Sequence, residues 1–214
     1  MELADVVSRF HKLYYESASR TWANTFWLGR HAMKCPLDLW IYQELIVECR
    51  PDVIIESGTY QGGTTLFLAS VCDIIGNGQV ITIDNHEDPA ARQPGPPHKR
   101  ITYLLGDSTS REIVETLRAM IGERDKVMVA LDSDHHKEHV LAELLIYSKF
   151  VTKGCYIVVE DTNIGGHPVA SDYGPGPMEA VEEFLKTNRN FMIDREREKF
   201  YLTFNPSGYL KRME

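Results

Sequence analysis

Two apolar stretches in the second half of the chain each end in acidic residues. Asp132 ends one stretch, and the adjacent pair Glu160 and Asp161 ends the next. If these stretches are neighbouring strands, the three carboxylates converge and, without a basic partner, repel each other. A hard divalent cation such as Mg²⁺ resolves that repulsion through oxygen ligands. We therefore predict a metal site at Asp132, Glu160 and Asp161. Asp134 is an alternative to Asp132, and a solvated acidic rim without metal is the simpler alternative.

A histidine lies three residues after Asp132. A hydroxyl bound to a metal loses its proton more readily, and imidazole titrates near neutral pH. His135 is therefore the predicted general base. His136 and His139 follow it in the sequence, and we expect them at the surface or behind the site.

A glycine-rich segment marks a second candidate site. An apolar run over residues 53–55 stops at Glu56, turns through glycines and enters a helical pattern, which indicates a strand, a tight loop and a helix N-terminus. Such a loop lets a ligand approach bare backbone, and acids follow two later apolar stretches. These features predict a nucleotide-type cofactor site. Its predicted residues are Glu56, Gly58, Thr59, Gly62, Gly63, Thr64, Asp84, Asp107, Ser108 and Asp132.

The spacing of the glycines bears on which cofactor binds. Gly58, Gly62 and Gly63 form a G-x-x-x-G-G pattern, not the G-x-G-x-x-G of dinucleotide sites, so a pyrophosphate and NAD are less expected. Glu56 and Asp84 suit a cofactor that carries a ribose and an amino-acid moiety. Residues 107–108 could hydrogen-bond an adenine edge, or they could instead cap a helix near 109–122.

The elements that must position these residues alternate between strand and helix patterns from residue 52 onward. Short runs rich in Val, Ile and Leu predict strands buried on both faces, over residues 53–57, 79–84, 101–105, 126–132 and 154–160. Helical patterns lie between them, over residues 63–75, 109–122, 136–152 and 176–187. This alternation predicts an α/β fold with a doubly wound, mostly parallel sheet.

The end of the chain differs from this pattern. Residues 191–195 and 199–204 predict two strands with no room for a helix between them, followed by a turn at 205–208. A late antiparallel hairpin on a five-strand parallel core resembles the seven-strand sheet of class I methyltransferases, and dinucleotide folds lack it.

The remaining segments divide the chain into two expected parts. Residues 1–50 are aromatic-rich and mostly helical in pattern, and we expect this extension to pack against the sheet or a sister subunit. Residues 51–214 form the expected main domain. Residues 85–100 and 161–177 predict long loops that begin at the carboxyl ends of strands, where such sheets bind ligands.

Composition excludes several function classes. The chain has 214 residues and a net charge of −8, which disfavours a nucleic-acid partner. Its four cysteines have no C-x-x-C spacing, so a thiolate zinc site is not expected. The sequence shows no signal peptide and no apolar run long enough to span a membrane, so we expect a cytoplasmic protein.

Several segments together carry a resemblance over nearly the whole chain. The chain is similar to the cephalosporin hydroxylase family in the segments Phe10–Tyr15, Cys35–Trp40, Glu56–Thr59, Leu131–His135, Glu160–Asn163, Gly174–Pro177 and Phe204–Lys211. Members look like class I methyltransferases that use S-adenosylmethionine and a divalent metal, and they are similar to O-methyltransferases acting on catechols and on macrolide or rhamnosyl sugars. The resemblance implies a metal on Asp132, Glu160 and Asp161, with His135 as base. Glu160 departs from the catechol-type pattern, which leaves the metal preference open.

The resulting hypothesis is methyl transfer from S-adenosylmethionine to a hydroxyl of a small natural product, an antibiotic or a sugar moiety. The expected partners are this small-molecule substrate and sister subunits in a homo-oligomer. A nicotinamide-dependent oxidoreductase or hydroxylase component is one alternative, which the glycine spacing and the hairpin disfavour. A non-catalytic cofactor-binding partner subunit is the other, which the presence of the acids and His135 disfavours.

Overall fold

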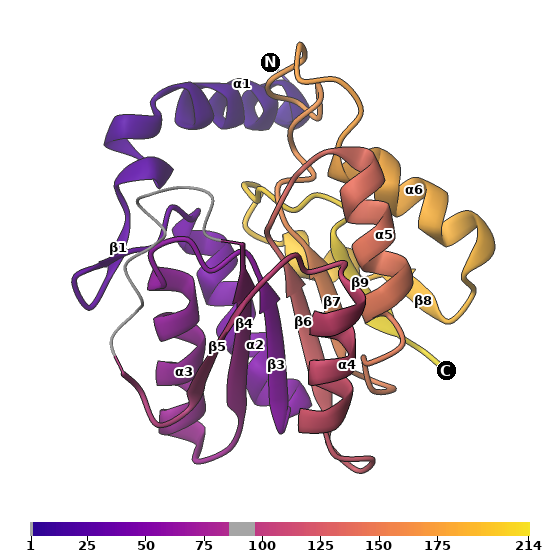
Figure 1. Ribbon diagram of the computed structural model, residues 1–214. Coiled ribbons are helices and arrows are strands. Elements are labelled where there is room, and N and C mark those ends of the chain that lie inside the picture. The colour runs from indigo at the N-terminus through magenta and orange to yellow at the C-terminus, as the bar shows by residue number, and fades with distance from the viewer. Residues whose placement is uncertain (1, 86–96) are drawn as a thin grey trace.

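The structure is a computed structural model that describes residues 2–85 and 97–214 (Figure 1). A seven-stranded sheet runs through its centre in the order β5-β4-β3-β6-β7-β9-β8. Its strands are β3 (Val53–Ser57), β4 (Gln79–Asp84), β5 (Ile101–Leu105), β6 (Val127–Leu131), β7 (Tyr156–Val159), β8 (Phe191–Ile193) and β9 (Tyr209–Arg212). β3 to β7 pair in parallel, whereas β9 is antiparallel to both of its neighbours. The predicted fold class is confirmed.

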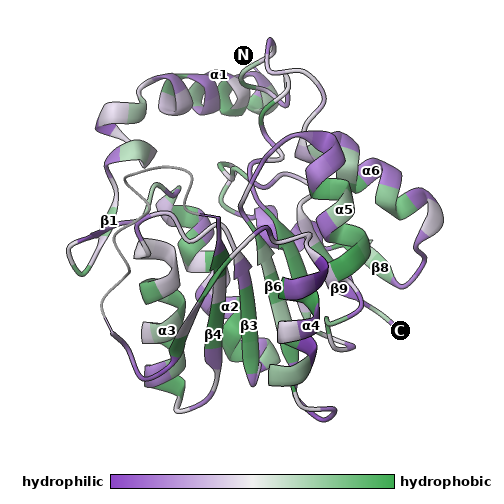
Figure 2. Ribbon diagram, viewed as in Figure 1, coloured by the Kyte–Doolittle hydropathy of each residue, from purple (hydrophilic) through white to green (hydrophobic). Residues whose placement is uncertain are grey.

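The central strands form because their residues are apolar on both faces. Every residue of β3, β6 and β7 is buried. In the register of the sheet, Ile55 lies between Ile81 of β4 and Val129 of β6. Figure 2 shows the resulting hydrophobic centre, with polar residues gathered toward the ends of the strands. Polar side chains can therefore collect at the carboxyl edge.

The helices are α1 (Leu3–Glu16), α2 (Pro36–Cys49), α3 (Gly63–Ile75), α4 (Arg111–Met120), α5 (Lys137–Tyr147) and α6 (Pro177–Thr187). Those from α2 onward cover both faces of the sheet, whereas α1 lies across the top of the fold in Figure 1. α2 packs against α3, and α5 packs against α6. In Figure 1, α4 and α5 lie in front of the sheet and α2 lies behind it, as alternating right-handed crossovers require. Within the described residues, no helix combines the length and apolar character needed to cross a membrane.

Within the first 50 residues, α2 belongs to the main core, whereas the segment before it forms a separate set of short elements. α2 begins at Pro36, as the sequence predicts, and buries Leu45 and Ile46 in the same core as the sheet. α1 is followed by two 3₁₀ turns, Ala18–Arg20 and Trp22–Asn24, and by a small hairpin of β1 (Phe26–Trp27) and β2 (Arg30–His31).

Aromatic residues of this N-terminal segment surround Phe204 from the far end of the chain. The ring of His11 stacks on Phe204 with centroids 5.7 Å apart, and the rings of Tyr14, Tyr15 and Trp22 lie 5.6–6.1 Å from it. These four rings therefore pack against the main body, whereas Phe10, Phe26 and Trp40 of the same segment are exposed.

The predicted strand at residues 199–204 is wrong, because β8 pairs with β9 instead. Leu202, Thr203 and Phe204 are buried, which explains their strand-like pattern. Their partner is Asp38 of α2 rather than a strand. Its carboxylate accepts hydrogen bonds from the Thr203 hydroxyl (2.6 Å) and the backbone N–H of Phe204 (2.8 Å). The segment is thereby fixed as an irregular connection.

Candidate active site

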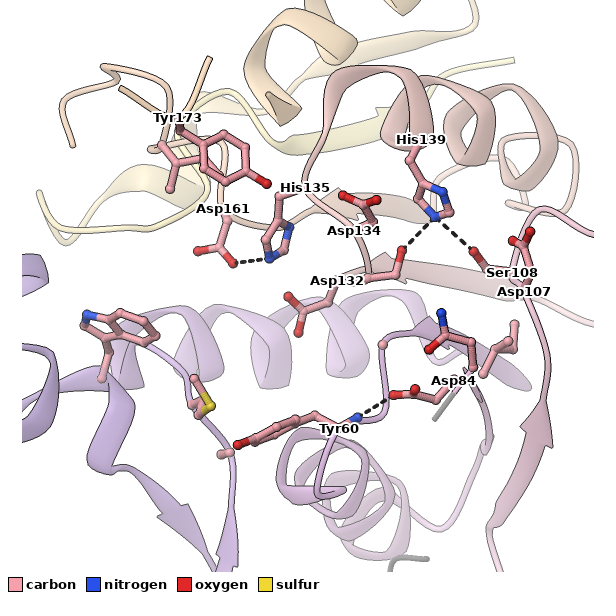
Figure 3. A pocket seen from close by; sticks show the side chains of 18 of the residues that line it. Tyr60, Asp84, Asp107, Ser108, Asp132, Asp134, His135, His139, Asp161 and Tyr173 are labelled. Carbon is pink, nitrogen blue, oxygen red and sulfur yellow. Dashed lines mark hydrogen bonds and ion pairs between the residues drawn. The ribbon is translucent and has the colours of Figure 1, made fainter. Parts of the chain in front are cut away.

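A cavity of about 970 Å³ lies beyond the carboxyl ends of the parallel strands (Figure 3). Seven of the predicted site residues line it: Gly58, Asp84, Asp107, Ser108, Asp132, His135 and Asp161. In Figure 3, Asp107, Ser108 and His139 gather on one side of the cavity, whereas Asp161 and Tyr173 lie on the other. The two sites predicted separately from the sequence thus share one cavity.

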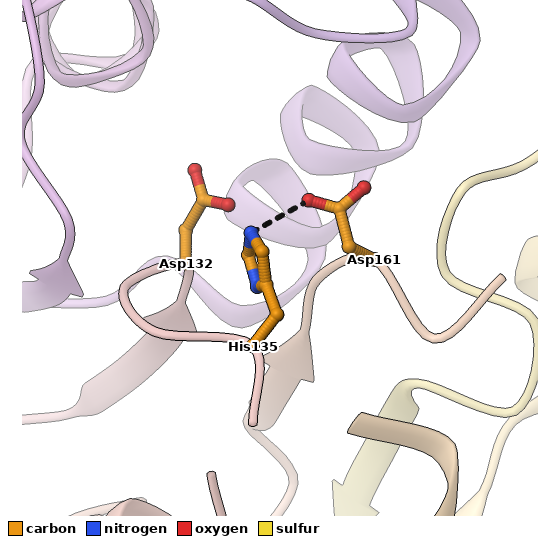
Figure 4. Close-up of side chains that lie close together, drawn as sticks. All are labelled: Asp132, His135 and Asp161. Carbon is orange, nitrogen blue, oxygen red and sulfur yellow. Dashed lines mark ion pairs between the residues drawn. The ribbon is translucent and has the colours of Figure 1, made fainter. Parts of the chain in front are cut away.

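Asp132, His135 and Asp161 form a tight cluster (Figure 4). One potential ligand atom from each lies within 4.8 Å of the others, and Nε2 of His135 lies 3.2 Å from Oδ2 of Asp161. Asp132 directly follows β6, and Asp161 follows β7 by one residue, so neighbouring parallel strands bring them together. Two carboxylates and an imidazole at this spacing fit a divalent cation.

The backbone of Asp161 has an unusual conformation. Its φ of 55° lies in the left-handed region that residues other than glycine rarely adopt. The side-chain Oδ1 of Asn205 accepts a hydrogen bond of 3.1 Å from the Asp161 N–H and holds this turn. Such conformations gather at functional sites, because the surrounding structure must impose them.

Glu160 is set apart from this cluster. It is 1% exposed, and both of its carboxylate oxygens are already bound. The hydroxyl of Tyr42 donates to Oε1 at 2.5 Å, and Nζ of Lys34 lies 2.7 Å from Oε2. Glu160 therefore lies behind the cavity, not on its wall.

Lys34 is the residue that the sequence reasoning missed. Its Nζ bridges Oε2 of Glu160 and Oδ2 of Asp132, the latter at 2.8 Å. The premise that these carboxylates converge without a basic partner is therefore wrong. Burial acts to lower the pKa of Lys34, but the charges of Asp132 and Glu160 outweigh it and raise the pKa above its ordinary value. A lysine two residues before a buried helix was the only signal in the sequence, and its spacing from the acids gave no reason to pair them.

Burial also shifts the pKa of Asp132, the acid that follows β6. It raises the pKa of Asp132 to about 7, against the lowering effect of Lys34. Asp134, the alternative ligand, instead accepts hydrogen bonds from the backbone N–H of His136 (2.9 Å) and from its ring (2.5 Å). The structure therefore places Asp132, and not Asp134, beside Asp161.

The glycine loop after β3 is packed directly against the loop after β6. Gly58 has a φ of 88°, and a Cβ at this position would lie 1.9 Å from the carbonyl oxygen of Asp132. Only glycine fits such a contact. On the other side, the backbone N–H of Tyr60 donates to Oδ2 of Asp84 at 2.8 Å. Asp84 thus holds the loop as well as lining the cavity.

The rest of the predicted cofactor residues shape this loop from behind. Thr59 hydrogen-bonds Thr82 at 2.6 Å, and a Cβ on Gly63 would lie 2.3 Å from the carbonyl oxygen of His31. The loop therefore docks onto the N-terminal hairpin. Five of the predicted cofactor residues lie outside the cavity lining, namely Glu56, Thr59, Gly62, Gly63 and Thr64.

Glu56 is buried beneath the loop. Its Oε2 accepts hydrogen bonds from the hydroxyls of Thr65 and Thr82. Its Oε1 is buried and has no hydrogen-bond partner within the described residues. Burial raises the pKa of Glu56 to about 7, although the two threonines act to lower it.

Asp107 and Ser108 do not cap α4, so that alternative is wrong. The N-cap is Ser110, whose hydroxyl accepts from the N–H of Ile113 at 3.3 Å. Oδ1 of Asp107 accepts from the backbone and hydroxyl of Thr109, at 2.7 and 2.8 Å. Both Asp107 and Ser108 line the cavity and are available to a ligand there.

The two later histidines separate in the structure. His136 is exposed and pairs with Asp134, as expected for a surface residue. His139 lines the cavity and lies against serine hydroxyls and Glu143. The predicted loop at 161–177 contributes Asp161, Ile164 and Tyr173 to the wall. Most of the other predicted loop, residues 86–96, lies outside the described residues.

Comparisons with known proteins agree with this geometry. The sequence profile of the family described as Rhamnosyl O-methyltransferase/CmcI matches residues 19–213. A rhamnosyl O-methyltransferase of Mycobacterium leprae (strain TN) is 38% identical over 217 residues, covering 97% of this chain and 90% of that protein. One of Mycobacterium tuberculosis (strain ATCC 25618 / H37Rv) is 37% identical over 214 residues, covering 97% and 85%.

The fold is also that of a solved structure. The structure named cmcI-D160 Mg-SAM has a TM-score of 0.67 to this chain at 23% identity, covering 90% of this chain and 78% of that one. The predicted family and enzyme class are confirmed. With a profile match over most of its length and relatives above 30% identity, the chain belongs to the Rhamnosyl O-methyltransferase/CmcI family of methyltransferases.

Proposed function

We propose that this chain transfers the methyl group of S-adenosylmethionine to a hydroxyl of a small natural product, a sugar moiety or an antibiotic, with the help of Mg²⁺ or another divalent metal. The observation that carries this proposal is the single cavity in which Asp132, His135 and Asp161 lie beside Gly58 and Asp84. The names of the relatives support a sugar hydroxyl as acceptor, and the similarity to a CmcI structure named for Mg-SAM supports both cofactors.

S-adenosylmethionine would bind on the side of the cavity near Asp84, Asp107 and Ser108. Carboxylates and hydroxyls at this edge suit the ribose and the adenine of a nucleoside. The buried Oε1 of Glu56 lacks a partner among the described residues beneath the same loop, which supports a donor group of the ligand nearby. Thr59, Gly62, Gly63 and Thr64 would act indirectly by fixing the shape of the loop.

The metal would be held by Asp132 and Asp161, which face the cavity. Glu160 is not among the residues that line the cavity, so it would contribute its charge from behind, through its contacts with Lys34 and Tyr42. A bound divalent cation draws electron density from a hydroxyl and so eases the loss of its proton. The site fits this role because its donors are carboxylate oxygens beside an imidazole.

His135 would accept the proton of the acceptor hydroxyl. Its Nε2 already lies 3.2 Å from Oδ2 of Asp161, so a carboxylate stands ready to stabilise the imidazolium that forms. The methyl group of S-adenosylmethionine is activated by its sulfonium, so the protein mainly has to align the oxygen with it. Tyr15, Trp22 and Tyr173 line the same cavity and offer flat amphipathic surfaces for a sugar or an aromatic ring.

We also propose that the N-terminal extension, residues 1–50, mediates a homo-oligomer. Leu3, Phe10 and Leu13 of α1 are 52–62% exposed, although they are large and apolar. An exposed apolar stripe of this kind often marks a protein interface. Sedimentation equilibrium of the purified protein measures the stoichiometry, and a monomer at all concentrations contradicts the proposal.

The methyl-transfer proposal is tested with Asp132→Asn. We expect this variant to lose Mn²⁺ binding, measured by electron paramagnetic resonance, and at least about 100-fold in turnover of a rhamnoside acceptor. Calorimetric titration with S-adenosylhomocysteine should give an affinity within about threefold of the wild type. Asp134→Asn is the matched comparison and should keep metal binding.

Two results would contradict the proposal. Full activity after a chelator has removed the metal would show that methyl transfer does not need a metal. Tight binding of NADH together with no binding of S-adenosylhomocysteine favours the nicotinamide alternative instead.

A further inference from the structure

Glu143 is a buried carboxylate directly behind one wall of the cavity. It lies on α5 and its exposure is 0%. Its Oε1 accepts hydrogen bonds from the hydroxyls of Ser108 (2.6 Å) and Ser133 (2.8 Å). Its Oε2 is buried without a hydrogen-bond partner among the residues that the structure describes. The proposed transfer reaction assigns no role to this carboxylate, although burying one is costly.

The two serines face the cavity, whereas Glu143 does not. A serine hydroxyl has one hydrogen to donate and two lone pairs with which to accept. Because Ser108 and Ser133 both direct that hydrogen to Glu143, only their lone pairs remain for a ligand. The carboxylate therefore turns two groups that could donate or accept into acceptors alone.

His139 reinforces this arrangement. Its Nε2 lies 3.3 Å from Oγ of Ser108, 3.1 Å from Oγ of Ser133 and 3.5 Å from Oε1 of Glu143. Each of these oxygens offers only lone pairs, so Nε2 must carry a hydrogen. The hydrogen bond to Glu143 raises the pKa of His139, which favours this donor form. A donor at Nε2 opposes any rotation of the serine hydroxyls back toward the imidazole.

Ser108 and Ser133 form one wall of the cavity, and Asp107 lies on the same side as Ser108 (Figure 3). Oδ1 of Asp107 accepts hydrogen bonds from the backbone N–H and the hydroxyl of Thr109. Its carboxylate is a further hydrogen-bond acceptor beside the two serines. This part of the cavity therefore suits a ligand group that donates hydrogen bonds.

We propose that Glu143 and His139 hold Ser108 and Ser133 as obligate acceptors, and that this wall selects the 6-amino group of adenine over a 6-oxo group. The inference rests on the proposed use of S-adenosylmethionine. An amino group donates two hydrogens, whereas the carbonyl of hypoxanthine presents lone pairs to lone pairs. Ser108 and Ser133 would touch the base, and Glu143 and His139 are positioning residues.

The test compares S-adenosylhomocysteine with S-inosylhomocysteine by calorimetric titration. The wild type should bind the adenosyl compound at least about 100-fold more tightly, because a wall that only accepts hydrogen bonds disfavours an analogue that places a carbonyl oxygen there instead of an amino group. In Glu143→Gln the carboxamide can donate to one serine oxygen, which frees that hydroxyl to point its hydrogen into the cavity. The preference should fall by at least about tenfold. Glu138→Gln makes the same chemical change at an exposed position of α5 and should keep the wild-type preference.

An unchanged preference in Glu143→Gln overturns the inference. If that variant does not fold, as judged by circular dichroism, Ser133→Ala replaces it. Ser133→Ala should weaken the adenosyl compound about tenfold and leave the inosyl compound within about twofold, and equal weakening of both overturns the inference. A wild type that binds neither compound is a different result, because it overturns the proposed cofactor and this inference with it.

Discussion

Nζ of Lys34 lies 2.7 Å from Oε2 of Glu160, and the pair is buried beneath the active-site cavity. The same ammonium contacts Asp132 at 2.8 Å. It therefore joins the segment before α2 to the ends of β6 and β7. Three carboxylates (Asp132, Glu160 and Asp161) and one ammonium sum to a formal charge of −3 + 1 = −2, which one divalent cation balances.

Replacing Lys34 with Met should destabilise the protein strongly. The change leaves Glu160 buried without its charged partner, and breaking a buried ion pair from one side typically costs about 3–5 kcal/mol. Urea unfolding of the apo protein measures the free energy of unfolding. Lys153→Met removes an exposed lysine as a control and should change it by less than about 0.5 kcal/mol. A loss below about 1 kcal/mol for Lys34→Met would show that the pair is not a structural link.

Ionisation of the buried Glu56 should lower the free energy of unfolding of the apo protein as the pH rises. Its pKa goes from an ordinary value of 4.5 to about 7 in the fold, because it is buried. Between these values the folded state binds more protons than the unfolded state, so the free energy of unfolding falls with increasing pH, by at most about 1.4 kcal/mol per pH unit from this group. The stabilising contribution is fully present below pH 4.5 and is lost as the pH passes 7.

Urea unfolding at pH 5 and pH 8 measures this effect. Glu56→Gln cannot ionise, so the difference between the two free energies should be smaller than in the wild type. Glu123→Gln changes an exposed glutamate in the same way and should leave the difference as it is. The same difference in Glu56→Gln and the wild type would rule out a perturbed Glu56.

His135→Gln should lower kcat by at least about 100-fold, since it removes the proposed base. The affinity for S-adenosylhomocysteine should stay within about threefold, because the histidine lies on the metal side of the cavity. His136→Gln alters the neighbouring exposed histidine and should retain activity. Equal activity of the two variants would mean that another group removes the proton.

The fold could be predicted from the sequence wherever local pattern and burial agree. The predicted strand at residues 53–57 matches β3, and Pro36 begins α2 as expected, because apolar runs and proline at a helix start act locally. The predicted strand at 199–204 failed since its burial comes from Asp38 and the aromatic rings of α1, over 160 residues away in the sequence. Pattern alone cannot tell a strand partner from such a contact.

In the site, too, the residues that follow strands could be predicted and those that depend on distant contacts could not. Asp132 and Asp161 could be placed at one sheet edge because parallel strands end together. Lys34 could not be found this way, since it comes from an irregular segment outside the sheet. Glu143 was also missed, because a single acid on a helix resembles any surface acid until the fold turns it inward.

Gly58 meets the carbonyl of Asp132 without a side chain between them, and the N–H of Asp132 donates to the carbonyl of Ser57 at 3.0 Å. The loop proposed to seat the methyl donor and the loop proposed to hold the metal are thus in main-chain contact. No side chain separates them at this point, so a main-chain hydrogen bond and direct backbone packing fix the spacing between the two loops. Substitutions of Tyr15, Trp22 or Tyr173 would then alter which molecule is methylated without altering the distance between the two loops.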